Sequence, residues 1–375
     1  MDFGFSSEQR MLRNSFKEFF NKECTPDLVR ELWNDPRGFS EQIWKKMAKL
    51  GWLGLVYDEQ YGGSECGFLD LFILFEELGK SQLPSPFFTS AVLSGGIIDA
   101  CGNEAQKRSY LKPIISGRSI LTLALLNNEG EPDFHSPEIE ATVDEKGEHR
   151  LNGVRWLVPY ANAADAILVC ADAIGSQSGP TLYCIETQSD GVTCTPLETL
   201  YGENKCVVQF DNVKVTADKI IGDIGRGNCC IEKILPQAIV LKCAEMIGGA
   251  RHVLDSTVAY VKERHQFGRP LGVLQAVQHL CADMNTLYTG ARLVAYQAAS
   301  RIEMKMPADK EVAIAKAWCS DAYKQMTWTA QQLFGGIGFT EEYHLQLYFK
   351  HAKECELLFG DSSHHRSKLA DAMGL

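Results

Sequence analysis

Residues 264–271 carry the sequence RHQFGRPL, and this stretch sets the fold of the last part of the chain. Gly268 and Pro270 end a helical pattern, because glycine and proline both interrupt helices. An apolar stripe follows at alternating steps of three and four residues: Val277, Leu280, Met284, Leu287, Ala291, Val294 and Ala298. This spacing is typical of one member of a helix bundle. We therefore expect a C-terminal four-helix bundle over residues 221–375, with a break between helices at Met306-Pro307.

Two other zones precede this bundle. Residues 118–220 show an apolar period of two, with short runs separated by turn signals at Asn152-Gly153, Asp190-Gly191 and Asp211-Asn212. This pattern predicts a small antiparallel β-domain, a sandwich or a barrel. Residues 1–117 return to a helical period, with Phe16, Phe19 and Phe20 on one face. The predicted fold class is α+β: an N-terminal helical domain, a central β-domain and a C-terminal bundle.

Composition limits the function. The chain has 375 residues, a net charge of −11, 45% hydrophobic residues and 23% charged residues, as in a soluble globular protein. The negative charge argues against nucleic acid and anionic membranes as partners, because both require a positive field. No apolar run approaches the roughly 18 residues of a spanning helix. The N-terminal sequence MDFGFSSEQR lacks the features of a targeting signal, so we expect a cytoplasmic, bacterial protein.

Disulfide and metal chemistry are not expected. The thirteen cysteines are odd in number and contain no Cys-x-x-Cys pair, which favours reduced thiols that serve in packing. The adjacent His364 and His365 would point about 100° apart on a helix, so they do not form a metal-binding pair.

Several motifs, in order along essentially the whole chain, resemble the acyl-CoA dehydrogenase family. They are Gly51-Trp52-x-Gly54 with Tyr61-Gly62-Gly63, Glu76-Glu77-Leu78-Gly79, Leu151-Asn152-Gly153-x-Arg155-Trp156, residues 264–271 with Gln275, Ala282-Asp283-Met284, and residues 332–339 with Glu342-Tyr343. Each motif alone is weak evidence, but their shared order and spacing are specific. The α–β–α order of the three zones agrees with the same family.

The resemblance implies an FAD site. Taken alone, Arg264 beside Phe267 suits a pyrophosphate, and Gly335-Gly336 either admits a ligand closely or merely interrupts a helix. In the family, residues matching Arg264, Gln266 and Phe267 of one subunit hold the adenosine diphosphate half of FAD. A neighbouring subunit contributes the residues that match Gln332, Gly335 and Gly336. The resemblance therefore also implies an obligate oligomer, either a homotetramer or an α2β2 heterotetramer.

The flavin-ring side departs from the family pattern. A Trp at the Trp156 position lies near the isoalloxazine ring in relatives, although Trp156 also fits the core of a β-domain. Leu126-Asn127-Asn128 replaces the usual Thr-Glu-Pro, and Trp156-Leu157-Val158 replaces Trp-Ile-Thr. Two hydroxyl groups that contact flavin in relatives are therefore lost, at Leu126 and Val158.

The family reaction is α,β-dehydrogenation of an acyl-CoA thioester. A carboxylate removes the α-proton, the β-hydrogen leaves as hydride to FAD, and an electron-transfer flavoprotein takes the electrons. The thioester carbonyl is polarised by a ribityl hydroxyl and by the backbone N–H at the base position, which Phe359 occupies here. Alignment on Lys350-His351-Ala352-Lys353 thus places an apolar residue where relatives carry glutamate. Ala238 occupies the base position of a second subfamily.

Three interpretations of this loss stay open. Asp361 could act as the base, or it could only cap the helix that follows. The chain could instead be a base-deficient subunit whose partner carries the carboxylate. Its Gly360-Asp361-x-x-His364-His365-Arg366 ending resembles subunits of paired dehydrogenases for steroid side chains, ring acids and dicarboxylic acyl-CoAs. Finally, the fold could serve decarboxylation or a structural role.

The altered residues predict an atypical substrate. We expect a cyclic, steroid-derived or dicarboxylic acyl-CoA rather than a straight-chain one. His364 could contact a CoA phosphate or a polar acyl group, and Arg292 could contact a CoA phosphate. A solvated helix face is the alternative for Arg292.

Overall fold

The computed structural model describes residues 4–127, 129–130, 132, 134–135, 138–144, 148–173 and 179–375. Asn128, one of the altered flavin-side positions, lies outside them. The described chain forms two compact units. One comprises Met1–Val29, Gly67–Leu83 and Ile239–Leu375, and the other comprises Arg30–Cys66 and Pro84–Ala238. These units cut across the three domain ranges 1–117, 118–220 and 221–375, which stay a prediction.

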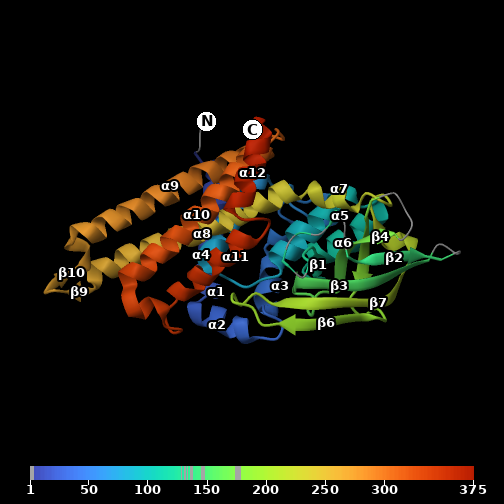
Figure 1. Cartoon of the computed structure of the whole chain (residues 1–375), viewed down its shortest axis with the longest axis horizontal. Coiled ribbons are helices and arrows are strands. Elements are labelled where there is room, and N and C mark those ends of the chain that lie inside the picture. The colour runs from blue at the N-terminus through green and yellow to red at the C-terminus, as the bar shows by residue number, and fades with distance from the viewer. Residues whose placement is uncertain are drawn as a thin grey trace. The chain divides into compact units, whose positions relative to one another are not determined.

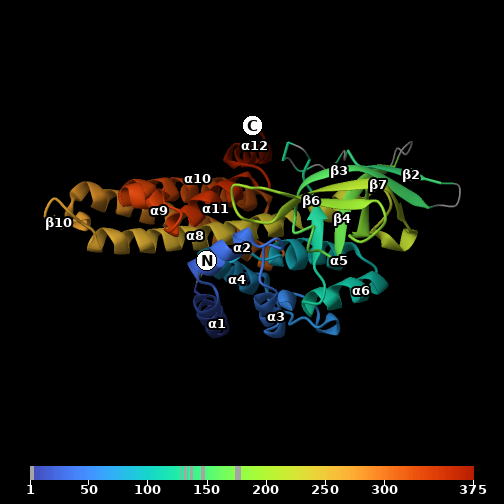
Figure 2. The ribbon, with the colours of Figure 1, turned by 90° about the horizontal axis from the view of Figure 1, so that it is seen from below.

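The first unit is helical, and its long helices run alongside one another in both Figure 1 and Figure 2. Its helices are α1 (Ser7–Glu23), α4 (Phe68–Ser81), α8 (Leu235–Glu263, from Ile239 on), α9 (Gln275–Glu303), α10 (Asp309–Phe334), α11 (Leu345–Leu357) and α12 (Ser362–Met373). A short hairpin of β9 (His265–Gln266) and β10 (Arg269–Pro270) joins α8 to α9. Two short 3-10 turns complete this unit: η5 (Leu271–Val273) and η6 (Gly335–Phe339).

The predicted breaks and stripe are confirmed in this unit. Helix α8 ends before Gly268, and the Met306-Pro307 pair lies between α9 and α10. Met284, Ala291 and Ala298 of the stripe are buried, whereas Val277 and Leu280 near the start of α9 are only half-buried. Leu287 and Val294 are half-buried as well, so the stripe is fully buried in this chain only at Met284, Ala291 and Ala298.

Two glycines let α4 and α8 cross closely. A Cβ atom at Gly79 would stand 2.0 Å from the backbone oxygen of Glu245, and one at Gly248 would stand 1.9 Å from that of Glu76. Real Cβ atoms do not approach a backbone so closely, so any larger residue at either position would push the two helices apart. This crossing places the backbone of Glu76 in α4 against Gly248 of α8.

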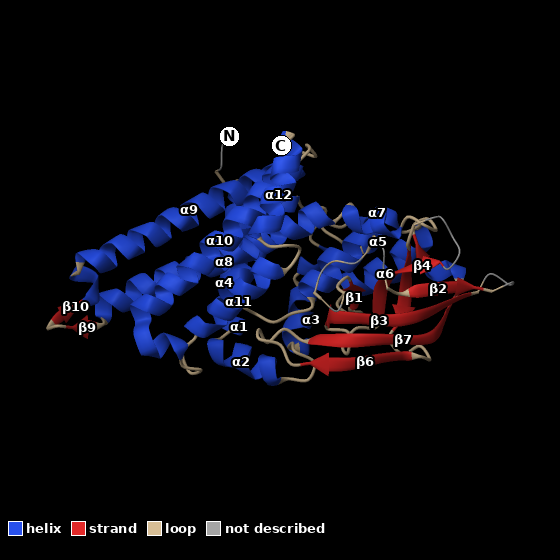
Figure 3. Cartoon of the chain, in the orientation of Figure 1, coloured by secondary structure: helices blue, strands red, loops and turns tan. Residues whose placement is uncertain are grey.

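The second unit combines helices with a mixed sheet (Figure 3). Its helices are α2 (Pro26–Asn34, from Arg30 on), α3 (Glu41–Lys49), α5 (Gly95–Cys101), α6 (Glu104–Ile115) and α7 (Gly227–Glu232), with the short turns η1 (Trp52–Gly54), η2 (Glu59–Tyr61) and η4 (Ala217–Lys219) and the π-helical segment η3 (Phe88–Ser94). Its strands are β1 (Leu121–Ala124), β2 (Glu140–Val143), β3 (His149–Pro159), β4 (Ala166–Ala173), β5 (Thr181–Glu186), β6 (Val192–Leu197), β7 (Lys205–Val215) and β8 (Ile220–Ile221).

The sheet is antiparallel at most pairings, as the sequence predicts. Its order is β6-β7-β3-β2-β4-β5-β8, with β1 beside β4. The β1–β4 and β2–β4 pairings are parallel, which the period of two alone does not reveal. Alternate side chains of these strands form an apolar core that includes Ile139, Leu151, Val158, Ile167 and Val208.

Two of the predicted turns are wrong. Asn152-Gly153 and Asp211-Asn212 lie inside β3 and β7, where the register shifts between Leu151 and Gly153. Gly153 has φ +140° and Asn212 has φ +53°, and the side-chain oxygen of Asn152 accepts the backbone N–H of Asn212 at 2.8 Å. These residues form a bulge, because the backbone that favours a turn also suits an irregularity within a strand pair. Asp190-Gly191 does form the turn between β5 and β6.

The helices of the described part include none that is both long and apolar enough to cross a membrane.

Candidate functional site

The hairpin between α8 and α9 presents three of the predicted cofactor residues. Arg264 follows the last turn of α8, and its backbone N–H donates to the carbonyl of Tyr260 at 2.8 Å. Arg264, Gln266 and Phe267 are exposed, and Phe267 reaches 87% exposure with φ +56°. A large apolar ring held so far out in a left-handed backbone conformation is unusual in a folded chain. These side chains are therefore available to a ligand or a partner.

The end of α10 presents the other predicted cofactor residues. Gln332, Gly335 and Gly336 are exposed, and Gly335 has φ +66°. A Cβ atom at Gly335 or Gly336 would meet no atom within 4 Å, so packing inside the chain does not require glycine there. A backbone without side chains suits the close approach of a ligand such as a pyrophosphate. This cradle and the exposed Arg264 fit the adenosine diphosphate half of FAD.

One contact ties the two segments together. The ring of Tyr260, just before the hairpin, stacks on the ring of Phe334 with centroids 4.1 Å apart. The Tyr260 hydroxyl also donates to the Phe334 carbonyl at 3.3 Å. The hairpin and the glycine pair therefore lie at the same end of the helical unit (Figure 1).

The flavin-side residues lie in the other unit. Leu126 and Trp156 pair through an isolated β-bridge, in which the backbone N–H of Trp156 donates to the Leu126 carbonyl at 3.3 Å. Trp156 is 37% exposed, so the structure does not bury it as a core tryptophan. Val158 is fully buried among the apolar side chains of the sheet. The structure therefore brings Leu126 and Trp156 together and favours a packing role for Val158.

The turn that follows α11 holds the predicted base position. Phe359 is 5% exposed with φ +63°, and Gly360 follows with φ +91°. The Phe359 carbonyl accepts a hydrogen bond from Nε2 of His365 at 2.9 Å. His365 is therefore protonated on Nε2 in its neutral form. Burial lowers the pKa of His365 to about 4, although its bond to the Phe359 carbonyl opposes this shift.

A buried lysine of α10 donates hydrogen bonds to the same turn. Lys316 is fully buried, and its ammonium donates to the Gly360 carbonyl at 2.8 Å, the Glu356 carbonyl at 3.0 Å and the Ser320 hydroxyl at 3.2 Å. Burial holds the pKa of Lys316 below its ordinary value. Sequence reasoning missed this residue, because its partners lie 40 and 44 residues away along the chain.

Asp361 caps helix α12. Its side-chain oxygen accepts the backbone N–H of His364 at 2.9 Å, as in the capping interpretation. This backbone hydrogen bond holds the pKa of Asp361 below its ordinary value. A general base for an α-proton requires the opposite shift, since proton transfer is most effective when the pKa lies near the working pH. His364 is exposed beside this cap.

A polar network lies between α4, α8, α10 and α11 and was also missed. Glu245 accepts from the Lys242 ammonium at 2.8 Å and lies 3.6 Å from Nε2 of His351. Gln82 and Tyr323 contact the other ring nitrogen of His351, and the Cys355 thiol lies 3.2 Å from Nε2. Burial alone would raise the pKa of Glu245, but Lys242 and His351 outweigh it and hold the pKa below its ordinary value.

Glu245, His351 and Cys355 also have the geometry of a metal-binding group. Because Lys242 already neutralises the carboxylate of Glu245, we interpret the group as an ion-pair network. Ala238, the alternative base position, is fully buried on α8. The remaining predicted residue, Arg292, lines a cavity together with residues of α1, α4 and α8.

Comparisons with known proteins agree with this architecture. Residues 6–118 match the family described as "Acyl-CoA dehydrogenase, N-terminal domain", and residues 225–374 match "Acyl-CoA dehydrogenase, C-terminal domain". The chain is 29% identical to the caffeyl-CoA reductase-Etf complex subunit CarC of Acetobacterium woodii, over 96% of both proteins.

Two solved structures have the same fold as this chain over its whole length. Butyryl-CoA dehydrogenase from Megasphaera elsdenii has a TM-score of 0.91 at 26% identity, with all of both chains covered. The ChsE4-ChsE5 complex from Mycobacterium tuberculosis has a TM-score of 0.90 at 28% identity, with 100% of this chain and 99% of that chain covered. The family matches and the similarity to these solved structures support one conclusion. The chain belongs to the acyl-CoA dehydrogenase family, whose members are FAD-dependent flavoproteins.

Proposed function

We propose that this chain is a base-deficient subunit of a heteromeric acyl-CoA dehydrogenase, in which a partner subunit supplies the carboxylate that removes the α-proton. One observation carries the proposal. The two positions where the family places its base hold the buried, apolar Phe359 and Ala238, while the nearby Asp361 is engaged as a helix cap. The low pKa of Asp361 further weakens its case as the base.

The nucleotide-binding residues have a role in this proposal. Arg264, Gln266 and Phe267 hold the adenosine diphosphate half of FAD together with Gln332, Gly335 and Gly336 of the adjoining subunit, as the family resemblance implies. Leu126 and Trp156 would line the side of the site that faces the flavin ring. FAD, when bound there, would supply the acceptor for the hydride that leaves the β-carbon. The backbone N–H of Phe359 donates to the thioester carbonyl, which makes the α-proton more acidic.

Exposed apolar side chains support an oligomer. Phe267, Trp318 and Trp328 are 87%, 49% and 57% exposed, and both tryptophans lie on α10. Side chains of this kind are commonly covered at subunit interfaces. We favour an α2β2 heterotetramer over a homotetramer, because only a second kind of chain can restore the missing carboxylate. The ChsE4-ChsE5 structure is named as a complex of two proteins.

The substrate in this proposal is a cyclic, steroid-derived or dicarboxylic acyl-CoA, and the enzyme works in the bacterial cytoplasm. The altered Leu126 and Phe359 positions support a substrate unlike those of straight-chain dehydrogenases. Electrons pass to an electron-transfer flavoprotein, and the name of CarC links that relative to an Etf complex.

Substitution of Asp361 in the flavin-loaded assembly tests the missing base. Asn caps helices about as well as Asp, so Asp361→Asn removes the carboxylate and keeps the cap. We expect acyl-CoA-dependent flavin reduction in a stopped-flow experiment to stay within about twofold of wild type. If Asp361 is the base, the rate falls by about 10²–10⁴-fold and the proposal fails. Asp361→Ala is the matched control, which loses about 1 kcal/mol of stability with the cap.

Purification tests the need for a partner. The chain should show no acyl-CoA oxidation when purified alone, and oxidation should appear when a family member with an intact base glutamate is co-expressed and co-purifies. Turnover by the isolated chain would contradict a heteromeric enzyme.

A further inference from the structure

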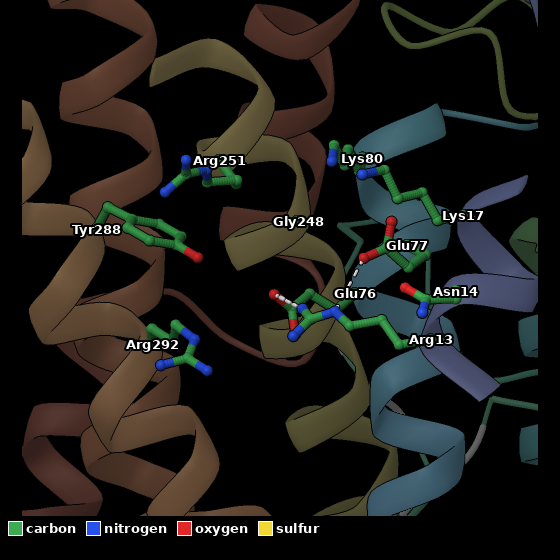
Figure 4. Close-up of a pocket in the computed structure, with 10 residues that line it drawn as sticks. All are labelled: Arg13, Asn14, Lys17, Glu76, Glu77, Lys80, Gly248, Arg251, Tyr288 and Arg292. Carbon is green, nitrogen blue, oxygen red and sulfur yellow. Dashed lines mark hydrogen bonds and ion pairs between the residues drawn. The ribbon is translucent and has the colours of Figure 1, made fainter. Parts of the chain in front are cut away.

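A cavity of about 420 Å³ lies within the helical unit and contains none of the predicted flavin residues. It is formed by residues of α1, α4, α8 and α9, and its volume falls within the usual range of small-molecule sites. Figure 4 shows Arg251, Tyr288 and Arg292 on one side and Lys17 and Lys80 on the other. The close crossing of α4 and α8 at Gly248 forms part of its wall.

The carboxylates of this cavity are already engaged. Glu76 and Glu77 are 3% and 6% exposed, and both form ion pairs with Arg13. The Tyr296 hydroxyl also donates to Glu76 at 2.5 Å. The charge of Arg13 is therefore paired with the two glutamates. These three side chains lie along one wall of the cavity.

The other cations of the lining lack such partners. Within the described part of the chain, the side chains of Lys17 and Lys80 have no ion pair or hydrogen bond, and Arg292 has no carboxylate partner. Arg251 pairs with Asp255 at 2.8 Å, within its own helix. The lining thus has five cationic side chains against two carboxylates, in a chain whose net charge is −11. A positive cavity in an acidic protein concentrates anions.

Aromatic rings position the two arginines. The guanidinium carbon of Arg292 lies 4.8 Å from the ring centre of Tyr296, and that of Arg251 lies 5.5 Å from the ring centre of Tyr288. Stacking on a ring restrains the plane of a guanidinium group and leaves its N–H edge available. Such an edge matches the paired oxygens of a phosphate.

We propose that this cavity binds a small anion with two linked phosphate groups, held by Arg251, Arg292, Lys17 and Lys80. The surplus of positive charge in the lining suits the negative charge of a diphosphate, and four cations from separate helices surround one volume. The ligand is either a free diphosphate or nucleotide, or the diphosphate of a CoA molecule. The inference does not depend on the missing base.

Isothermal titration of the flavin-loaded full-length protein with inorganic pyrophosphate tests this site. Flavin loading keeps the nucleotide cradle at Gly335 and Gly336 from competing. We expect saturable binding that weakens as salt is raised, because the contacts are charged. Lys17→Met with Lys80→Met should weaken it by about tenfold or more. Neither side chain has an intrachain partner to lose, so both substitutions should leave the fold intact.

A matched control and further ligands define the result. Lys22→Met, on the same helix α1 but outside the cavity, should change affinity by less than about twofold. Tighter binding of ADP than of pyrophosphate identifies a nucleotide, and tighter binding of free CoA than of ADP identifies CoA. Three results overturn the proposal: no binding at millimolar pyrophosphate, equal weakening by Lys22→Met, or equal binding of citrate. Dissociation of the oligomer by the double variant without any loss of anion binding also overturns it, since another chain then occupies the cavity.

Discussion

The segments predicted to bind the nucleotide differ from the turn predicted to hold the base position in how far this chain surrounds them. Phe267 is 87% exposed and Gly335 has no neighbour for a Cβ atom, so the first region is incomplete within one chain. Phe359 is 5% exposed, Lys316 donates to the Gly360 carbonyl and His365 donates to the Phe359 carbonyl. The first region is thus exposed in this chain, whereas buried side chains of the same chain donate hydrogen bonds to the second. The geometry of this turn therefore does not depend on which side chain stands at position 359.

The largest effect should come from restoring the carboxylate. In the chain purified without its partner and loaded with flavin, we expect Phe359→Glu to raise acyl-CoA-dependent flavin reduction by about 10²-fold or more over the unmodified chain, because a positioned proton-transfer group contributes that much to the rate. Stopped-flow absorbance measures the rate. Phe359→Leu keeps the position apolar and should leave the rate unchanged. If Phe359→Glu retains its flavin but gains no rate, the turn is not the base position.

The second prediction concerns the hydrogen bonds from Lys316 to the turn that contains Phe359 and Gly360. Lys316→Met removes a charged donor and leaves the buried carbonyls of Glu356 and Gly360 unsatisfied. We expect the free energy of unfolding to fall by about 3 kcal/mol, as measured with urea. Lys310→Met, exposed on the same helix, should change it by less than about 0.5 kcal/mol. If Lys316→Met lowers the free energy of unfolding by as little as Lys310→Met does, then the hydrogen bonds from Lys316 do not stabilise the turn.

Low pH should weaken the contribution of His365, which donates to the Phe359 carbonyl, to the stability of the protein. The pKa of His365 is about 4 in the folded protein and near 6.5 when unfolded, so the unfolded state binds more protons between these values. The stabilising contribution of neutral His365 is therefore complete above pH 6.5 and is lost as the pH falls toward 4. His365→Gln should reduce the pH slope of stability by about 1.4 kcal/mol per pH unit in this window. Urea titrations at several pH values measure the slope, and an unchanged slope would rule out a buried neutral histidine.

A substitution at the exposed glycine pair should change the affinity for FAD and leave the stability unchanged. Gly336→Ala places a methyl group where nothing lies within 4 Å, so thermal stability of the flavin-free protein should not change. We expect FAD to bind about tenfold more weakly, because the backbone no longer comes close to the nucleotide. Fluorescence titration with FAD gives the affinity. Loss of stability without loss of affinity would mean that the glycine serves the fold alone.

The sequence predicted these two regions unequally. The segments around Phe267 and Gly335 are continuous in sequence, so their motifs could be recognised from the sequence alone. Lys316 could not be, because a buried lysine and two carbonyls 40 and 44 residues away carry no local pattern. The Asn152 bulge was predicted as a turn for a related reason. Only the pairing of β3 with β7 distinguishes the two.

The stacking of Tyr260 on Phe334 has a consequence for stoichiometry. Under the proposed function, each chain carries both sets of predicted nucleotide-binding residues at one end, so a symmetric pair of identical chains creates two equal nucleotide sites. A pair of different chains creates two unequal sites, one of which can be empty. The number of flavins bound per pair of polypeptides therefore distinguishes the two assemblies. Fewer than two flavins per pair indicates a pair of different chains.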